Sequence, residues 1–127
     1  MKTEDFYTLI QLFLEECVET MKTKGKAYAG KDQSIFANFN RVAAKKRIPR
    51  QVVASIYMDK HLDALDSFIR GEYGDPEPIE GRIKDVINYL LLLYGMIMEQ
   101  QMAIPAPDAP NKSFVRFHPS GTQKSLK

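Results

Sequence analysis

"EGRIKDVINYLLLLYGMIM", from Glu80 to Met98, is the most hydrophobic stretch of this chain and decides its fold class. At ~100° per residue, apolar side chains cover nearly the whole circumference of a helix that extends from Pro78 to about Ala103. Such a helix lies at the centre of its assembly. Asp85 and Asn88 are three residues apart within it and therefore share one face. Because burying an unpaired carboxylate is costly, this face predicts a partner, a bound cation or a functional role.

Three more helices precede this segment. Apolar residues recur at helical spacing from about Thr3 to about Lys24, with Cys17 as a small core residue on that stripe. Ser34 can cap a second helix, which ends in the basic sequence KKRIPR. A third helix runs from about Pro49 to Arg70 and stops at Gly71. Each helix thus has a cap, a proline or a glycine at its ends.

No segment shows the sustained alternation of a strand with hairpin turns. We therefore expect an all-α bundle of four main helices, formed by one domain over residues 1–103. Residues 104–127 contain four prolines and no helical period, which predicts an extended or mobile tail. Its "SFVRF" segment has two interpretations, an arm that packs on a neighbouring subunit or part of a loose tail.

Composition narrows the class of protein. A net charge of +2 gives no strong signal for nucleic acid, and a single cysteine fits a reducing, cytoplasmic compartment without internal disulfides. The N-terminal segment has acids before its apolar run and no small-residue cleavage site, so we do not expect a signal peptide. The apolar run 86–98 is too short and interrupted to span a membrane. Its many apolar sides favour a homo-oligomer.

Acidic residues gather on three of the four predicted helices. They are Glu15, Glu16 and Glu19 on the first, Asp59, Asp63 and Asp66 on the third, and Asp85 on the fourth. Hard cations such as Mg²⁺ prefer oxygen ligands, so these clusters are candidates for a magnesium site. The alternative is that the first two clusters are solvated faces. No Cys/His spacing suggests zinc: His61 stands alone in the helical part, and His118 lies in the tail.

The sequence KGKAYAGKDQ (24–33) is expected to be a loop, because two glycines interrupt the helical pattern. It places Lys24, Lys26 and Lys31 around Tyr28. Lysines bind phosphates as point charges, and a tyrosine ring can stack on a base. A solvated, lysine-rich loop is the competing interpretation. The chain contains neither G-x-x-x-x-G-K-[ST] nor G-x-G-x-x-G, two glycine-rich signatures of phosphate-binding loops.

Four sequence elements resemble those of a known family. They are K-x-x-x-Y at 24–28, "ANF" at 37–39, the lysine Lys60, and E-G-x-x-x-D-x-x-N-Y at 80–89. Over about Met21 to Met98 the chain resembles the nucleotide-modification-associated domain family of phage and prophage proteins. The D-x-x-N-Y element inside an apolar helix is the most specific of these. The resemblance implies a nucleotide ligand and, for a phage-encoded protein, the bacterial host cytoplasm.

The chain is also similar, more distantly, to the MazG-like all-α nucleoside triphosphate pyrophosphohydrolases. These helical bundles are usually oligomeric and hydrolyse (d)NTPs to the monophosphate and pyrophosphate. Their signature E-E-x-x-E matches Glu15, Glu16 and Glu19, and their E-x-x-D matches only at Asp85. The resemblance implies that these four residues bind Mg²⁺. Arg82 stands where a metal-binding Glu is expected, which removes a ligand, adds a positive charge and argues against catalysis.

Three functions are compatible with the sequence. The first is Mg²⁺-dependent hydrolysis of a (d)NTP, with activation of a water by the metal. The second is a non-catalytic protein that sequesters a nucleotide, for example a cyclic nucleotide signal of host immunity. The third is a helical interaction protein in which Asp85 and Asn88 fix the register between helices. For the first two, the predicted nucleotide-binding and phosphate-binding residues are Lys26, Tyr28, Lys31, Lys60, Arg82 and Asn88.

Overall fold

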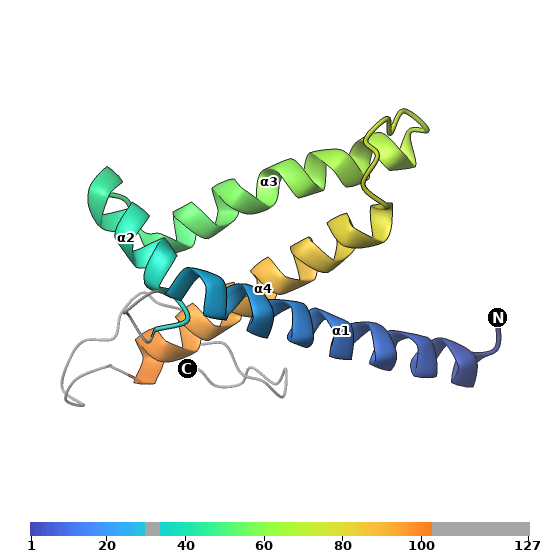
Figure 1. The fold of residues 1–127 in the computed structure, drawn as a ribbon, viewed down its shortest axis with the longest axis horizontal. Helices are drawn as coiled ribbons and strands as arrows, with labels where there is room; N and C mark the ends of the chain where they lie inside the picture. The colour runs from blue at the N-terminus through green and yellow to red at the C-terminus, as the bar shows by residue number, and fades with distance from the viewer. Residues whose placement is uncertain (30–33, 103–127) are drawn as a thin grey trace, which may run out of the picture.

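The computed structural model describes residues 1–29 and 34–102. This part of the chain forms four α-helices and no strand: α1 (Thr3–Ala29), α2 (Ala37–Lys46), α3 (Arg50–Ile69) and α4 (Ile79–Met102). The prediction of an all-α fold with four helices is confirmed. The helices α3 and α4 form an antiparallel pair, α2 packs on α3, and α1 crosses α4 (Figure 1). The predicted tail, residues 104–127, lies outside the described residues.

The ends of α3 follow the predicted proline and glycine signals. Pro49, with φ −63° and ψ 145°, is the extended residue that precedes the first turn. At the other end Gly71 adopts a left-handed φ of 77°, a conformation that glycine reaches without a steric penalty. Its N–H donates to the carbonyl of Phe68, and the N–H of Glu72 donates to the carbonyl of Ser67. These bonds satisfy carbonyls that the helix end would leave unpaired.

Two predicted boundaries are wrong. The first helix continues to Ala29, so the backbone of residues 24–29 is helical and not a loop. Gly25 lowers helix propensity but lets Ile35 approach, because a Cβ at this position would lie 3.3 Å from the Ile35 Cδ1. The second helix starts at Ala37, and Ser34 forms a preceding turn in which its Oγ accepts from the N–H of Phe36 at 3.0 Å.

The hydrophobic core lies where α2, the first half of α3 and the second half of α4 meet. Its buried members are Phe36, Phe39, Val53, Ala54 and Met96. Half-buried residues surround it, namely Val42, Ala43, Ile48, Tyr57, Tyr89 and Leu92. Gly95 lies directly under this cluster, since a Cβ there would come within 3.0 Å of the Phe36 ring. The missing side chain at residue 95 therefore lets the Phe36 ring pack against the α4 backbone.

Arg50 ties the corner between α2 and α3 to the end of α4. Its Nη2 lies 2.6 Å from the Oε1 of Glu99, and its Nη1 donates to the Oδ1 of Asn40 at 3.1 Å. The guanidinium carbon also lies 4.8 Å from the centroid of the Phe36 ring, in a cation–π contact. One side chain thus joins three helices beside the core.

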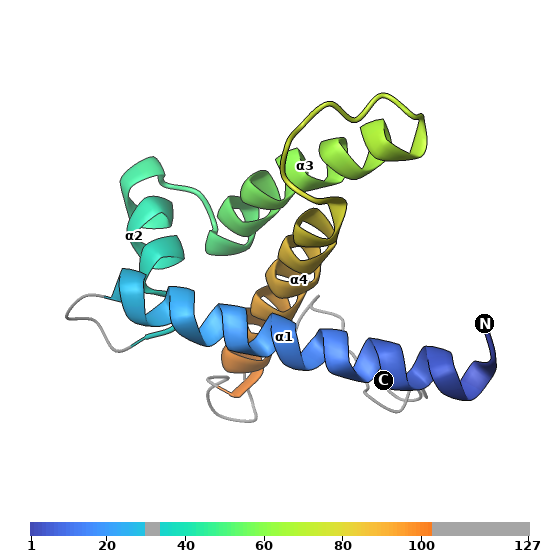
Figure 2. The same cartoon turned by 45° about the vertical axis from the view of Figure 1, so that its right-hand side comes forward.

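The N-terminal half of α1 projects away from the other helices in both views (Figures 1 and 2). The prediction for Cys17 is confirmed, because its side chain is fully buried in the part of α1 that crosses α4. Burial raises the pKa of the Cys17 thiol, so this side chain is a neutral core residue. Among the described helices, no segment combines the length and the hydropathy that a membrane span requires.

Candidate functional site

A pocket of about 370 Å³ opens between α1, α2, α3 and α4. This volume falls in the range of small-molecule sites. The aromatic rings of Phe39, Tyr57 and Tyr89 form one part of its lining. The polar residues of the lining are Lys24, Ser34, Asn38, Asp85 and Asn88, and the remaining lining residues are Met21, Gly25, Ile35, Ala37 and Leu92.

Asp85 and Asn88 both line this pocket, as expected from their shared helical face. Asn88 is one of two polar residues that are buried among the described residues, with 9% of its surface exposed. Its Oδ1 has no hydrogen-bond partner in the described part of the chain. A buried acceptor without a partner costs about 1–3 kcal/mol, and ligand donors are one way to recover that free energy. The Asn88 amide is therefore the strongest candidate for a ligand contact.

Asp85, which lies on α4, contacts one side chain of α1 and one side chain of α3. Its Oδ1 lies 3.5 Å from the Nζ of Lys24, 61 residues earlier in the chain. Its Oδ2 lies 3.4 Å from the Nδ1 of His61. The carboxylate is mostly buried whereas the lysine is mostly exposed, so solvent screens this pair and its contribution to stability is small. Lys24 and Asp85 thus bring opposite charges to the same pocket.

His61 is the second buried polar residue, and sequence reasoning missed its role. The Nη1 of Arg82 lies 3.0 Å from its Nδ1. Because a guanidinium only donates, Nδ1 must accept, which places the proton of the neutral ring on Nε2. Burial lowers the pKa of His61, the Asp85 carboxylate opposes this shift, and the positive charges of Arg82 and Lys60 support it. His61 is therefore neutral near pH 7.

A signal for the position of His61 was present in the sequence. His61 follows Tyr57 by one helical turn, and Tyr57 follows Val53 by another, so the three residues share the inward face of α3. The Tyr57 and Tyr89 rings are in edge contact, and the His61 ring lies 5.7 Å from the Tyr89 ring. A histidine on this inward face becomes buried when the helices pack, and the side chains that contact its ring nitrogens come from another helix.

Arg82, a predicted phosphate-binding residue, is held outside the pocket by the loop between α3 and α4. Its Nη2 lies 2.6 Å from the Oδ2 of Asp75, and its Nε lies 3.5 Å from the Oε1 of Glu77. The hydrogen bond to Asp75 contributes most to raising the pKa of Arg82, followed by a hydrogen bond with Tyr73 and by the negative charges of Glu77 and Asp75. Arg82 pairs with these two acids and with His61, and its guanidinium fastens the loop to α4.

The predicted metal ligands on α1 do not converge on Asp85. Glu15, Glu16 and Glu19 are all exposed, and Glu15 and Glu19 lie on the side of α1 opposite the buried Cys17. Two of the glutamates have lysine partners, Glu16 with Lys84 at 3.6 Å and Glu19 with Lys22 at 3.9 Å. Within residues 1–29 and 34–102 no three His, Cys, Asp or Glu side chains are placed to hold a metal ion. The magnesium site stays a prediction.

The other predicted nucleotide-binding and phosphate-binding residues lie on α3, at the end of α1, and outside the described residues. Lys60 is exposed on α3 and does not line the pocket. Lys26 and Tyr28 lie in the last turns of α1, beyond Lys24, where the structure describes the backbone course alone. Lys31 lies outside the described residues. Pocket residues that were not predicted as ligand contacts include Asn38, which the "ANF" element had marked only as part of a resemblance.

The acidic residues of α3 lie on its exposed side. Asp59, Asp63 and Asp66 are all exposed, and the carboxylate of Asp66 accepts from the guanidinium of Arg70 one turn later. They do not line the pocket. This placement favours the interpretation of the stripe as a solvated face.

Comparisons with protein-family models, with curated proteins and with solved structures give no match for this chain. The fold and the pocket themselves define the class, an all-α protein whose helices enclose a ligand-sized pocket. The chemistry of that pocket combines aromatic rings, a buried amide and one exposed cation.

Proposed function

We propose that this protein binds a nucleotide in the pocket, with the base beside the aromatic rings and the phosphate at Lys24. The observation that carries the proposal is the buried Asn88 side chain, whose Oδ1 has no hydrogen-bond partner among the described residues and which lines the pocket. An asparagine offers an acceptor and two donors, which suits the edge of a base that carries both. The aromatic lining suits the flat faces of the same base.

The phosphate side of the proposal depends on Lys24. Its side chain is 58% exposed, and its Nζ already lies 3.5 Å from the Asp85 carboxylate. A bound phosphate placed at this ammonium would share the cation with Asp85. Because this ammonium is exposed to solvent, such a contact contributes on the order of 1 kcal/mol. Lys26 and Lys31 add positive charge close to Lys24 in the sequence.

Binding without turnover is the form of the function that the geometry favours. The Asp85 carboxylate has a cation on one side and the neutral His61 on the other, and Arg82 is held by Asp75. The glutamates of α1 are exposed and paired with lysines where they have partners. We therefore propose sequestration of a nucleotide, linear or cyclic, as the function. The resemblance to phage proteins of nucleotide modification supports a nucleotide as the ligand.

Mg²⁺-dependent hydrolysis of a (d)NTP is the second candidate, carried by the E-E-x-x-E match of α1. The metal would require Glu15, Glu16 and Glu19 to reach the site of Asp85. One chain does not bring these groups together in its described part. Carboxylate and phosphate oxygens would be the ligands if the ion arrives with the nucleotide. Mg²⁺ alone should then leave the thermal stability of the protein unchanged.

Isothermal titration calorimetry across linear and cyclic nucleotides tests the proposal, with and without Mg²⁺. In parallel, release of pyrophosphate is measured on the same nucleotides. Binding without pyrophosphate release supports sequestration, whereas release that depends on Mg²⁺ supports the second candidate. If no nucleotide binds at millimolar concentration under either condition, the proposed function is wrong, and a helical interaction protein is the alternative that is left.

A further inference from the structure

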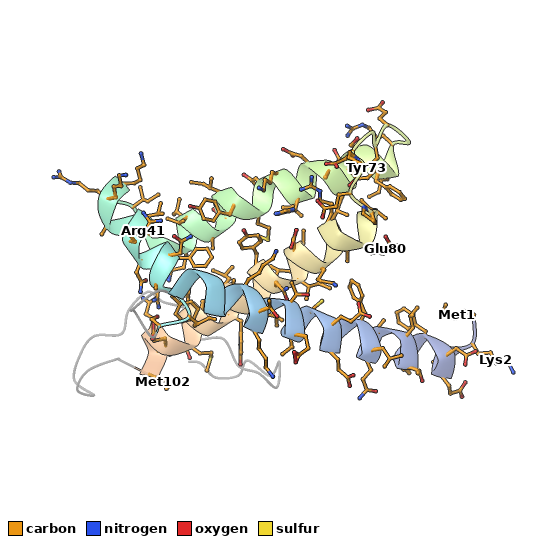
Figure 3. All side chains as sticks on the ribbon, in the orientation of Figure 1. Met1, Lys2, Arg41, Tyr73, Glu80 and Met102 are labelled. Carbon is orange, nitrogen blue, oxygen red and sulfur yellow. The ribbon has the colours of Figure 1, made fainter. Side chains whose placement is uncertain are left out.

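The N-terminal half of α1 carries large apolar side chains that no other described helix covers. Five of them are between 44% and 61% exposed, namely Phe6, Tyr7, Leu9, Leu12 and Leu14. In the side-chain view this half of the helix projects from the rest of the molecule toward Met1 and carries side chains along its whole length (Figure 3). Exposed apolar side chains that are contiguous on one element mark an interaction surface.

Three of these exposed side chains, Phe6, Leu9 and Leu14, share one helical face with the half-buried Ile10 and Phe13, and Tyr7 and Leu12 flank this face. At ~100° per residue, Leu9, Phe13, Phe6, Ile10 and Leu14 fall within an arc of about 140°. We refer to these five residues as the α1 apolar face. Cys17 and Met21 fall inside the same arc, one and two turns further along the helix. Cys17 is fully buried, and Met21 lines the pocket.

The α1 apolar face is therefore a continuation of the face that docks on α4. The contacts between these two helices include one at Phe13, whose ring centroid lies 5.9 Å from the Nζ of Lys84. They continue through Glu16, which pairs with Lys84, to Lys24, which pairs with Asp85. The helix is 27 residues long, about 40 Å, so its first half extends beyond the region that α4 covers.

We infer that a second copy of this chain covers the α1 apolar face, and that the two copies pack α1 on α1 about a twofold axis. In such a dimer the same face serves both copies, so one apolar stripe is enough. The five exposed side chains on this face and its flanks, at about half of their full exposure, leave on the order of 500 Å² of surface per chain. Two copies would together bury on the order of 1,000 Å², which is the lower limit of a specific interface.

The width of the face favours a helix as the occupant. An arc of about 140° matches the stripe of a helix in a helix–helix interface, whereas an extended segment contacts a narrower strip. The competing occupant is the C-terminal segment 103–127 of the same chain, which contains the apolar sequence SFVRF. These two occupants differ in one measurable property, because only a second copy makes the coverage depend on protein concentration.

The first experiment determines the mass of the full chain by light scattering at micromolar concentrations. The inference requires twice the chain mass of 14.5 kDa. The double variant Phe6→Gln/Leu9→Gln should return the monomer mass while its circular dichroism stays helical. The matched control is Thr8→Gln/Gln11→Glu, two exposed positions on the opposite side of the same stretch, and it should keep the doubled mass. A wild-type monomer, or a double variant that stays dimeric, would overturn the inference.

The second experiment needs no variant and keeps the test decisive if the double variant fails to fold. Amide hydrogen exchange of the wild-type chain is measured over residues 6–14 at several protein concentrations. A dimer through α1 should slow this exchange, and dilution should remove the protection. Protection that is independent of concentration would assign the face to segment 103–127, and absence of protection would show an uncovered face. Either result would overturn the inference but leave the proposed nucleotide pocket untouched.

Discussion

The Nη1 of Arg82 lies 3.0 Å from the Nδ1 of His61, and this contact fixes the protonation state of the histidine. The same Nδ1 lies 3.4 Å from the Oδ2 of Asp85. A proton on Nδ1 would favour Asp85 but repel the guanidinium. The neutral ring, with its proton on Nε2, accepts from Arg82 and is the form that the folded chain selects.

A pH dependence of stability follows from this arrangement. The pKa of His61 is lowered in the folded chain, chiefly by burial, so the unfolded chain binds more protons once the pH falls below about 6.5. The contribution of His61 to the free energy of unfolding should then be fully present above about pH 6.5 and should decrease as the pH falls through and below that value. Urea unfolding between about pH 5 and pH 7.5 measures this slope.

The variant His61→Gln should flatten that slope, because glutamine does not titrate. His118→Gln, at the only other histidine of the chain, is the matched control and should leave the slope in place. A wild-type chain that gains stability on acidification would mean that His61 is charged when folded and is paired with Asp85.

The Asn88→Leu variant should separate ligand binding from stability. Leucine has the same branched shape and lacks the unpartnered Oδ1, and the pocket beside residue 88 can take its larger methyl groups, so the melting temperature should stay the same or rise. Nucleotide affinity should fall by about 1–3 kcal/mol, or ~5- to ~150-fold in Kd. Calorimetry measures the affinity and scanning calorimetry the melting temperature. Unchanged affinity would remove Asn88 from the proposed site.

Lys24 and Lys22 provide a matched pair for the phosphate contact. Both lysines are exposed on α1, but only Lys24 lines the pocket. Lys24→Gln should weaken nucleotide binding by on the order of 1 kcal/mol, or about fivefold in Kd, and make it less sensitive to salt. Lys22→Gln should leave both quantities as they are. Equal losses in the two variants would indicate a diffuse electrostatic effect and not a defined phosphate site.

Met96 and Met102 test the position of the core. Met96 is fully buried in the core cluster, whereas Met102 is 80% exposed at the end of the same helix. Met96→Ala should cost about 2–5 kcal/mol in the free energy of unfolding, because it removes buried apolar surface and leaves a cavity. Met102→Ala should change it by less than about 0.5 kcal/mol. Urea unfolding of both variants gives the two values directly, and similar values would place the core elsewhere.

Arg82→Ala distinguishes the two roles considered for Arg82. With Asp75 and Glu77 as its partners, the arginine holds the loop before α4. The variant should therefore unfold at a lower temperature, and its nucleotide affinity, measured where it is folded, should be retained. A large loss of affinity without loss of stability would instead support the predicted phosphate contact.

The fold class could be predicted from local patterns, because helix periods and end signals act over a few residues. Pro49 and Gly71 bound α3 as predicted, and Asp85 and Asn88 share a face as predicted. The error at Gly25 has the same origin, since its cost in helix propensity is local whereas the close approach of Ile35 is not.

The candidate site is a property of the tertiary structure. By itself the sequence determined four helices, a buried Cys17 and a polar pair on the most apolar helix. Only the packing of α1, α3 and α4 decided that Lys24 and His61 meet Asp85 and that the guanidinium of Arg82 turns to Asp75. Contacts such as the one between Lys24 and Asp85, 61 residues apart, depend on how whole helices cross. That crossing is set by the summed burial of many side chains, which no spacing of a few residues encodes.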